Sequence, residues 1–390
     1  MSILIVQTPA FNPNDGGVQR ITFNLGRYFT KIGYNVAYFS FQKDNHTESR
    51  YGKLYHAKVS GLDDNSSNID YLKEVVRSFK PNFVVNQMPY QPRLRHAMAE
   101  INDYDNIKVI ACIHNSLFSF KSNVKDIMKR ELPQPFDILM STEPLCKIPL
   151  LYHKIKHRHD LKAILKAHHT TLLYTPPNYD ELTYFLKPTD LKDSNVDFMP
   201  NPVADVLEHV PEKEKIILHV GRINIPQKRS DLLLDFWEQT YKQLPEWRFQ
   251  ILGHGPYSDT LAEDLKERGL PRVELLGYQK PEIFYEKAAI FMMPSAYEGF
   301  PNTVIEAQSF GCPVVAFNSY AALEWIVGED NSHLLATPFD TSELAKLCVD
   351  LAKNKAQLET LQNVALKNAE QFTIEKVGKQ WQELFEELAR

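Results

Sequence analysis

The chain has 390 residues and a formal net charge of −5, with apolar residues at 43% and charged residues at 24%. One hydrophobic core usually stops growing before this length, so we expect two domains. The mildly acidic balance gives no overall attraction to nucleic acid, and the composition excludes extensive disorder. The cysteines are scattered without metal-ligand spacing and favour reduced thiols in a cytoplasm; they are Cys112, Cys146, Cys312 and Cys348.

The first half alternates short β-rich runs with helical patterns. Residues 3–6 form a short apolar run with no basic region before it, which predicts a buried first strand rather than a signal peptide or a membrane span. Gly16 and Gly17 follow in a loop, and a helical pattern covers 21–29. Further strands are expected at 35–41, 83–86, 109–113, 138–141 and 171–174, and a helix at 71–79. This alternation predicts a parallel sheet covered by helices.

The second half repeats this rhythm after a stretch with little periodicity. Strands are expected at 215–220, 248–252, 273–276, 290–293 and 314–317, with a helix at 231–241. We therefore expect an N-terminal domain at 1–202, a linker at 203–214, a second domain at 215–370, and a C-terminal helix at 371–390 that crosses back to the first domain. Two doubly wound α/β domains of this kind should face a cleft, because ligands bind outside the carboxyl ends of their strands.

The segment between Glu298 and Glu306 is the most informative part of the sequence. A helix that begins near Pro301 or Asn302 leaves Glu298 in the preceding loop and places Glu306 about one turn inside the helix. The backbone amides from Phe300 to Thr303 would then point outward and could hold a diphosphate or a sugar. Taken singly, each glutamate would be an ordinary solvated carboxylate.

Taken together with its context, this segment resembles the motif of retaining glycosyltransferases of family 4, the glycosyl transferases group 1. That family has the GT-B architecture of two facing Rossmann-like domains. The resemblance covers the whole chain in the same order, through Gly16-Gly17, His114, Met199-Pro-Asn201, Gly221-Arg222, Lys228 and Gly253-His-Gly255. The last of these lacks the third glycine of a dinucleotide fingerprint, so it favours a phosphate-side loop over a nicotinamide site.

The resemblance implies a role for each matching residue. Glu306 would accept hydrogen bonds from the ribose hydroxyls, Glu298 would contact the transferred sugar, and Arg222 and Lys228 would balance the diphosphate charge. For His114, contact with the donor sugar and a satisfied histidine in the core remain alternatives. The remaining donor-site positions are Gly16, Gly17, Gly221, Gly253, Gly277, Phe300, Pro301, Asn302 and Thr303.

The expected activity is that of a metal-independent hexosyltransferase that needs no cofactor. Its donor would be a nucleotide diphosphate sugar, UDP rather than GDP, and its acceptor a glycan or a lipid-linked sugar in surface polysaccharide synthesis. Retention implies attack from the face that the phosphate leaves, with a phosphate oxygen taking the proton. A covalent route through Glu298 is the alternative mechanism. A phosphorylase or epimerase on the same fold, and a non-catalytic sugar-nucleotide-binding subunit, are the alternative functions.

Two polar clusters invite a metal-site interpretation. Asp103 and Asp105 have the spacing of a metal-binding pair, but we interpret them as a solvated turn. His157, His159, His168 and His169 are interleaved with lysines and an arginine, and cations repel a metal ion. This basic segment also has an apolar stripe through Leu151, Ile155, Leu161, Ile164 and Leu165. Such a helix could meet an anionic membrane surface, placing the enzyme peripherally on its cytoplasmic face, or could simply be a solvated helix packed on the sheet.

Overall fold

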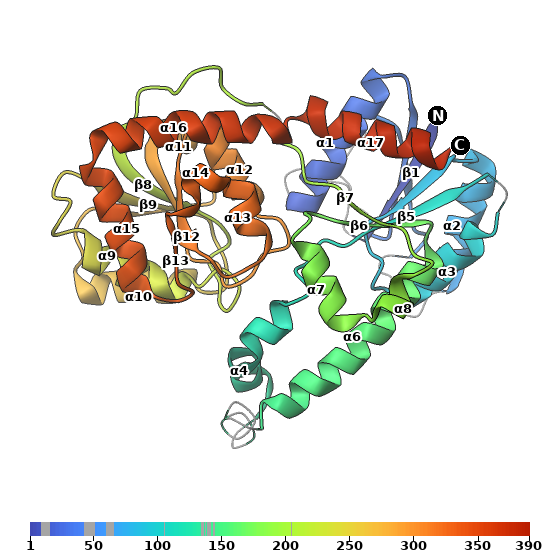
Figure 1. Ribbon diagram of the computed structural model, residues 1–390, viewed down its shortest axis with the longest axis horizontal. Coiled ribbons are helices and arrows are strands. Elements are labelled where there is room, and N and C mark those ends of the chain that lie inside the picture. The colour runs from blue at the N-terminus through green and yellow to red at the C-terminus, as the bar shows by residue number, and fades with distance from the viewer. Residues whose placement is uncertain are drawn as a thin grey trace. The chain divides into compact units, whose positions relative to one another are not determined.

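The computed structural model describes residues 1–8, 16–42, 51–59, 66–104, 106–133, 136, 138, 142, 145–203 and 205–390 (Figure 1). The chain forms two compact units. The first comprises Met1–His114, Tyr152–Ala204 and Ile374–Arg390. The second comprises Asn115–Leu151 and Asp205–Thr373, and so includes a segment that we expected in the N-terminal domain. All four cysteines are buried free thiols.

The first unit is built on a parallel sheet of seven strands in the order β3-β2-β1-β4-β5-β6-β7. The strands are β1 (Ser2–Gln7), β2 (Asn35–Ser40), β3 (Lys53–His56), β4 (Phe83–Asn86), β5 (Lys108–Cys112), β6 (Thr170–Leu173) and β7 (Val196–Phe198). Sequence analysis did not find β3 and β7. Both lie at the sheet edges, and their side chains are mostly half-buried, so they lack the apolar run of a central strand.

Helices cover both faces of this sheet. They are α1 (Gly17–Lys31), α2 (Ser66–Phe79), α3 (Pro92–Asn102), α6 (Lys147–Ala167, in this unit from Tyr152), α7 (Asn178–Phe185), α8 (Pro188–Leu191) and α17 (Ile374–Leu388). Because successive strand residues face opposite ways, Ile3 and Ile5 pack with α1 and α17, whereas Leu4 and Val6 pack with α2 and α3. The first unit therefore has three layers.

The C-terminal helix α17 packs on the first sheet through aromatic residues. The rings of Phe385 and Phe83 lie 4.4 Å apart between centroids, and Phe385 and Phe29 lie 5.5 Å apart.

The strand expected at 138–141 falls mostly outside the described residues. Ile138, its one described residue, is helical and exposed, so the prediction is wrong at that position because no neighbouring strand buries this side chain.

The second unit contains a parallel sheet of six strands in the order β10-β9-β8-β11-β12-β13. The strands are β8 (Glu214–Val220), β9 (Arg248–Leu252), β10 (Val273–Gly277), β11 (Ala288–Met293), β12 (Val314–Phe317) and β13 (Leu335–Ala336). Its helices are α4 (Ser119–Glu131), η1 (Ser230–Leu232), α9 (Leu233–Thr240), α10 (Ser258–Arg268), α11 (Glu282–Lys287), α12 (Asn302–Ser309), α13 (Ala322–Val327), α14 (Glu329–Ser332), α15 (Thr341–Lys353), α16 (Lys355–Ala369) and η2 (Glu370–Phe372).

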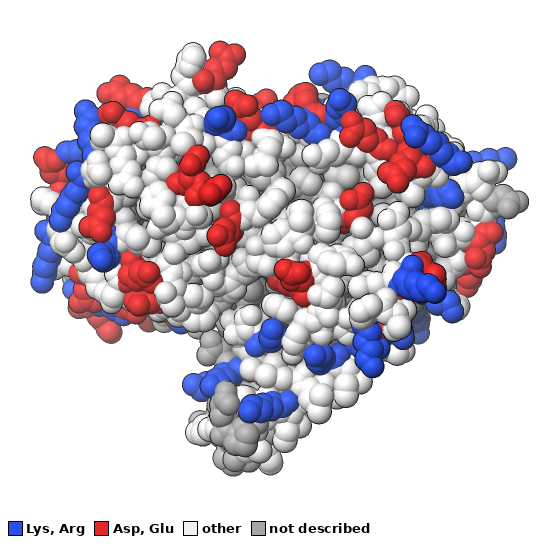
Figure 2. Space-filling view, viewed as in Figure 1, with Lys and Arg blue, Asp and Glu red and all other residues white. Residues whose placement is uncertain are grey.

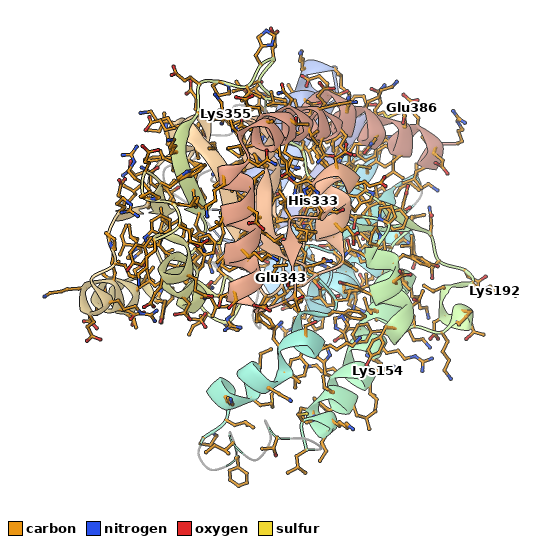
Figure 3. The ribbon with its side chains drawn as sticks, turned by 60° about the vertical axis from the view of Figure 1, so that its left-hand side comes forward. Lys154, Lys192, His333, Glu343, Lys355 and Glu386 are labelled. Atoms are coloured by element: carbon orange, nitrogen blue, oxygen red, sulfur yellow. The ribbon has the colours of Figure 1, made fainter. Side chains whose placement is uncertain are left out.

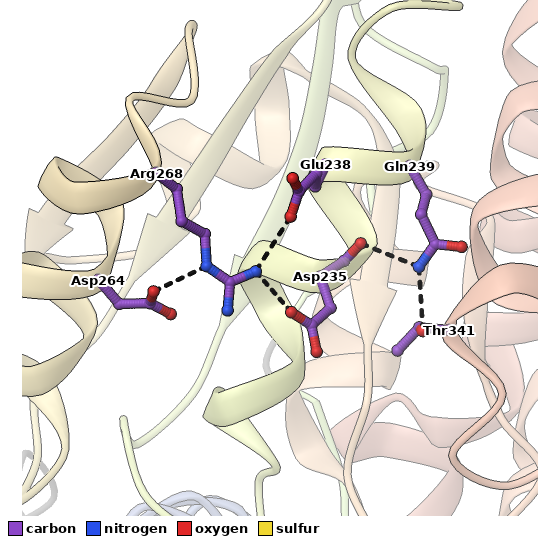
Figure 4. A network of polar contacts seen from close by, with 6 residues as sticks. All are labelled: Asp235, Glu238, Gln239, Asp264, Arg268 and Thr341. Atoms are coloured by element: carbon purple, nitrogen blue, oxygen red, sulfur yellow. Dashed lines mark hydrogen bonds and ion pairs between the residues drawn. The ribbon is translucent and has the colours of Figure 1, made fainter.

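A polar network ties α9 to its neighbours on the surface of the second unit (Figure 4). Arg268 of α10 pairs with Asp235 at 2.6 Å and with Asp264 at 2.7 Å. Gln239 of α9 accepts a hydrogen bond from Ser342 and donates one to Thr341, both on α15. Beneath the network, Phe236 and Trp237 are fully buried against β9. The buried aromatic core stabilises this layer far more than exposed ion pairs can.

Candidate functional site

Three glycines predicted for the donor site lie at the carboxyl ends of neighbouring strands in the second unit. Gly221 follows β8, Gly253 follows β9 and Gly277 ends β10. The amide of Gly253 donates to the carbonyl oxygen of Gly277 at 2.8 Å. Gly253 has φ +138°, and a Cβ there would lie 1.8 Å from the carbonyl oxygen of Gly221. Only glycine permits this close approach of the two loops.

Lys228 and Glu298 form a buried ion pair beside these loops. Nζ of Lys228 lies 2.8 Å from Oε1 of Glu298, and the two side chains keep 14% and 8% of their exposure. Gln227 donates from Nε2 to the second oxygen of Glu298 at 3.3 Å, and its carbonyl accepts from the amide of Ala296 at 2.7 Å. From the sequence we expect Lys228 to contact the diphosphate and Glu298 the transferred sugar, and nothing in it points to Gln227. The structure brings all three together.

Arg222 differs from its neighbours because its charge has no partner among the described residues. It is exposed, and within the described part of the chain it forms no ion pair or hydrogen bond. By contrast, Arg229 is bound to Asp231 through Nε and Nη2, at 3.0 and 2.8 Å, and lies over the ring of Phe339. An unpaired guanidinium beside a glycine-lined loop is suited to a bidentate contact with phosphate oxygens.

The start of α12 only partly matches the expected amide cradle. Asn302 begins the helix as predicted, and Pro301 precedes it. The amide of Asn302 donates to the carbonyl of Phe300 at 3.0 Å, while Pro301 has no N–H. The expectation that every amide from Phe300 to Thr303 points outward is therefore wrong for Pro301 and Asn302, because one has no hydrogen to donate and the other closes a turn.

Glu306 is half-buried on α12 and is held by a tyrosine. The hydroxyl of Tyr285, a buried residue of α11, donates to Oε2 of Glu306 at 3.1 Å. This contact fixes the direction of the carboxylate before any ligand arrives. Sequence analysis identified Glu306 but not Tyr285, whose position in a different helix gives no motif-level signal.

Buried polar atoms gather at or just after the carboxyl ends of β8 and of the next two strands in the sheet, β11 and β12. Nε2 of His219, Oγ of Ser295 and the hydroxyl of Tyr320 are buried without a hydrogen-bond partner among the described residues. Burial lowers the pKa of His219 to about 4, so its ring is neutral. Burial and the negative charge of Glu298 raise the pKa of Tyr320, so its hydroxyl stays protonated. Groups of this kind favour a polar ligand.

In the first unit, His114 is a neutral ring with both nitrogens engaged. Nδ1 accepts from the hydroxyl of Tyr174 at 2.5 Å, and Nε2 donates to Oε1 of Gln87. Burial lowers its pKa to about 4. Together with Asn201, these residues line a small cavity of the first unit. Of the two expectations for His114, the geometry favours the satisfied histidine and gives no support to acid–base work.

The other N-terminal candidates begin a helix. Gly16 precedes α1 and Gly17 is its first residue, and the amide of Arg20 donates to the carbonyl of Gly16 at 3.1 Å. They lie in the first unit, whereas the glycines at 221, 253 and 277 lie in the second. Asp103 follows α3 as its C-cap residue, and Asp105 falls outside the described residues, so the interpretation of the two aspartates as a solvated turn stays a prediction.

His153 and His157 of α6, and His168 just after the helix, are engaged by neighbouring residues. The rings of His153 and His157 stack at 5.1 Å, and burial lowers the pKa of His157 to about 4. His168 bonds to Asn86 and to the carbonyl of Ile164. Among the described residues, no group of His, Cys, Asp and Glu is arranged to hold a metal ion.

Comparisons with known proteins show what this chain is similar to. The family model of glycosyl transferases group 1 matches residues 214–354, the part that carries the strand-end glycines and both glutamates. An uncharacterized glycosyltransferase of Haemophilus influenzae is 24% identical over 376 residues, covering 94% of this chain and 95% of that protein. The chain is a glycosyltransferase.

Further matches are more distant or partial. The poly(ribitol-phosphate) alpha-N-acetylglucosaminyltransferase of Staphylococcus aureus is 30% identical over 45% of this chain and 36% of its own length. The structure of Alr3699/HepE from Anabaena in complex with UDP-glucose superimposes with a TM-score of 0.72 at 14% identity, covering 99% of this chain and 100% of that one. The glycosyltransferase therefore has the GT-B fold that the resemblance implied.

Proposed function

We propose that this enzyme is a retaining hexosyltransferase or N-acetylhexosaminyltransferase of family 4 that uses a UDP-sugar. The observation that carries the proposal is the uncommitted Arg222 beside the buried Lys228–Glu298 pair, at strand ends lined by glycine. A leaving nucleoside diphosphate develops negative charge, and these cations could stabilise it where the backbone can approach. The complex of the Anabaena protein with UDP-glucose supports the choice of donor.

In this proposal each residue of the second unit has one task. Arg222 and Lys228 bind the diphosphate together with the loops at Gly221, Gly253 and Gly277. Glu306, fixed by Tyr285, accepts from the ribose hydroxyls. The start of α12, from Phe300 through Pro301 and Asn302 to Thr303, lies against the diphosphate or the sugar.

Glu298 has to change partners when the donor binds. In the structure its oxygens are shared between Lys228 and Gln227. When Lys228 turns toward a phosphate oxygen, the released carboxylate oxygen can accept from a hydroxyl of the transferred sugar, while Gln227 keeps the other oxygen in place. The acceptor hydroxyl then attacks on the face that the phosphate leaves, and a phosphate oxygen takes its proton. His114, Gly16 and Gly17 of the first unit stay predictions for contact with the donor.

The acceptor that we propose is a glycan or a lipid-linked sugar of surface polysaccharide synthesis, reached from the cytoplasmic face of a membrane. The name of the Staphylococcus aureus relative, which acts on poly(ribitol-phosphate), supports a polymeric acceptor. No helix of the described residues is long and apolar enough to cross a bilayer. Attachment to an anionic surface would therefore be peripheral.

The test begins with a thermal-shift panel of nucleotide sugars, because a ligand that binds only the folded state raises its stability. A UDP-sugar should raise the melting temperature, and transfer to a glycan acceptor should give a product with the donor's anomeric configuration by NMR. Turnover should survive EDTA, since cations and amides take the place of a metal. A product of inverted configuration, or phosphate-dependent cleavage, would refute the proposed reaction.

A further inference from the structure

The first half of α6 carries an apolar row that is largely exposed in the described part of the chain. Ile148, Leu151, Tyr152 and Ile155 are exposed by 59%, 61%, 68% and 63%. Their spacing of three and four residues puts them on one face of the helix, along about two turns. Further along the same helix, Leu161 and Ile164 are fully buried, together with most of Leu165. The predicted apolar stripe is therefore divided into a packed half and an uncovered half.

Some basic residues of α6 are bound within the fold, and others are exposed. Arg158 and Lys162 both pair with Asp190, at 2.6 and 2.9 Å, so both side chains are held within the fold and the one carboxylate balances one of their two charges. Lys147 and Lys156 are exposed beside the apolar row. Lys154, labelled in Figure 3, is half-buried with its ammonium 3.8 Å from the centroid of the Tyr184 ring.

Within this part of α6 the charged residues have one sign. From Lys147 to His159 the helix contains no Asp or Glu, and its first acidic residue is Asp160. Figure 2 shows Lys and Arg side chains along the visible edge of α6, whereas Asp and Glu gather elsewhere on this face of the molecule. An apolar row flanked by lysine is the pattern of a helix that lies in a bilayer surface, with its apolar side chains among the acyl chains and its lysines at the headgroups.

We propose that the first half of α6 docks on an anionic lipid bilayer by inserting Ile148, Leu151, Tyr152 and Ile155, while Lys147 and Lys156 contact the headgroup phosphates. This surface differs from the basic stripe predicted from the sequence, because Arg158 and Lys162 take no part. It adds the attachment surface to the proposed function and rests on that function only for the expectation of a lipid-linked acceptor.

Vesicle sedimentation with the full-length protein tests the proposal without any donor, so its outcome is independent of the proposed reaction. The protein should sediment with vesicles of equal parts phosphatidylglycerol and phosphatidylcholine, and much less with phosphatidylcholine alone. Ile148→Ser, Leu151→Ser and Ile155→Ser together should weaken binding about tenfold or more, because each removes a large inserted apolar group. The matched control replaces the equally exposed Tyr278 and Ile283 with Ser.

A second pair of variants separates charge from apolar insertion. Lys147→Gln with Lys156→Gln should weaken binding to the anionic vesicles roughly tenfold, whereas Lys266→Gln with Lys280→Gln, which removes the same charge elsewhere, should leave it nearly unchanged. Equal sedimentation of the wild type and the apolar variant would overturn the proposal. So would a wild-type dimer, detected by light scattering, that the apolar variant loses, because the row would then bind a second copy of the chain.

Discussion

The two cations of the proposed donor site should respond differently to removal. Lys228→Met leaves the carboxylate of Glu298, which is 7% exposed, without the ammonium that lies 2.8 Å away. Breaking a buried pair from one side costs about 3–5 kcal/mol, and the residual exposure of both side chains argues for the lower end. For a unit of this size, about 3 kcal/mol corresponds to a fall in melting temperature of about 6–12 °C.

Arg222→Ala should have the opposite profile. Its side chain is exposed and unpaired in the described structure, so the free energy of unfolding should change by less than about 0.5 kcal/mol. Turnover should nevertheless fall about a hundredfold or more, the scale seen when one preorganised electrostatic donor is removed. Lys at position 222 should rescue poorly, because an ammonium cannot reproduce the bidentate fork of a guanidinium.

Calorimetry and steady-state kinetics on the same preparations test this reasoning. The double variant Lys228→Met with Glu298→Gln removes both charges and should recover most of the melting temperature without recovering turnover. If Lys228→Met melts like the wild type, the buried pair does not stabilise the fold as described. If Arg222→Ala keeps near wild-type rates at saturating donor, the diphosphate is bound elsewhere and the proposed donor site is wrong.

Two further predictions follow from single contacts and from burial. Glu306→Ala should weaken donor binding by about 1.5–3 kcal/mol in calorimetry, since it removes hydrogen bonds to a charged group, and Tyr285→Phe should weaken it less; unchanged affinity would refute the ribose role. Burial lowers the pKa of four histidines from 6.5 to about 4; they are His114, His157, His168 and His219. Between these pH values the unfolded chain binds more protons than the folded chain. The free energy of unfolding should therefore fall as the pH drops through this range, on the order of 1 kcal/mol per pH unit for each histidine. Equal free energies of unfolding at pH 7 and pH 5, measured by denaturant titration, would contradict this prediction.

The central strands could be predicted because strands that are buried on both faces consist mostly of apolar residues. β11 and β12 are buried over their whole length and appear in the sequence as uninterrupted apolar runs. The edge strands β3 and β7 carry no such run, since one side of an edge strand lacks a neighbour. The helix at 147–167 could be found from its pattern, but whether Leu151 or Leu161 meets a partner depends on the tertiary fold.

The site shows the same division between local and non-local information. Glu298 and Glu306 stand in one segment whose spacing places them near a helix start, so a motif suffices to find them. Gln227 and Tyr320 act on Glu298 from the loops after β8 and β12, and only the strand order β8-β11-β12 brings them to it. Their residue types are ordinary in loops, so nothing local marks them.

This arrangement suggests why the carboxylate of Glu298 can be buried before a ligand is present. Lys228 balances its charge and Gln227 holds one oxygen, while the protonated hydroxyl of Tyr320 stays close enough for the two groups to interact electrostatically. In the proposed reaction, these neutral dipoles remain around the carboxylate when Lys228 moves to a phosphate, and they reduce the cost of losing its cation. The donor's own hydroxyl groups can then complete the set of hydrogen bonds, which couples binding of the sugar to binding of the diphosphate.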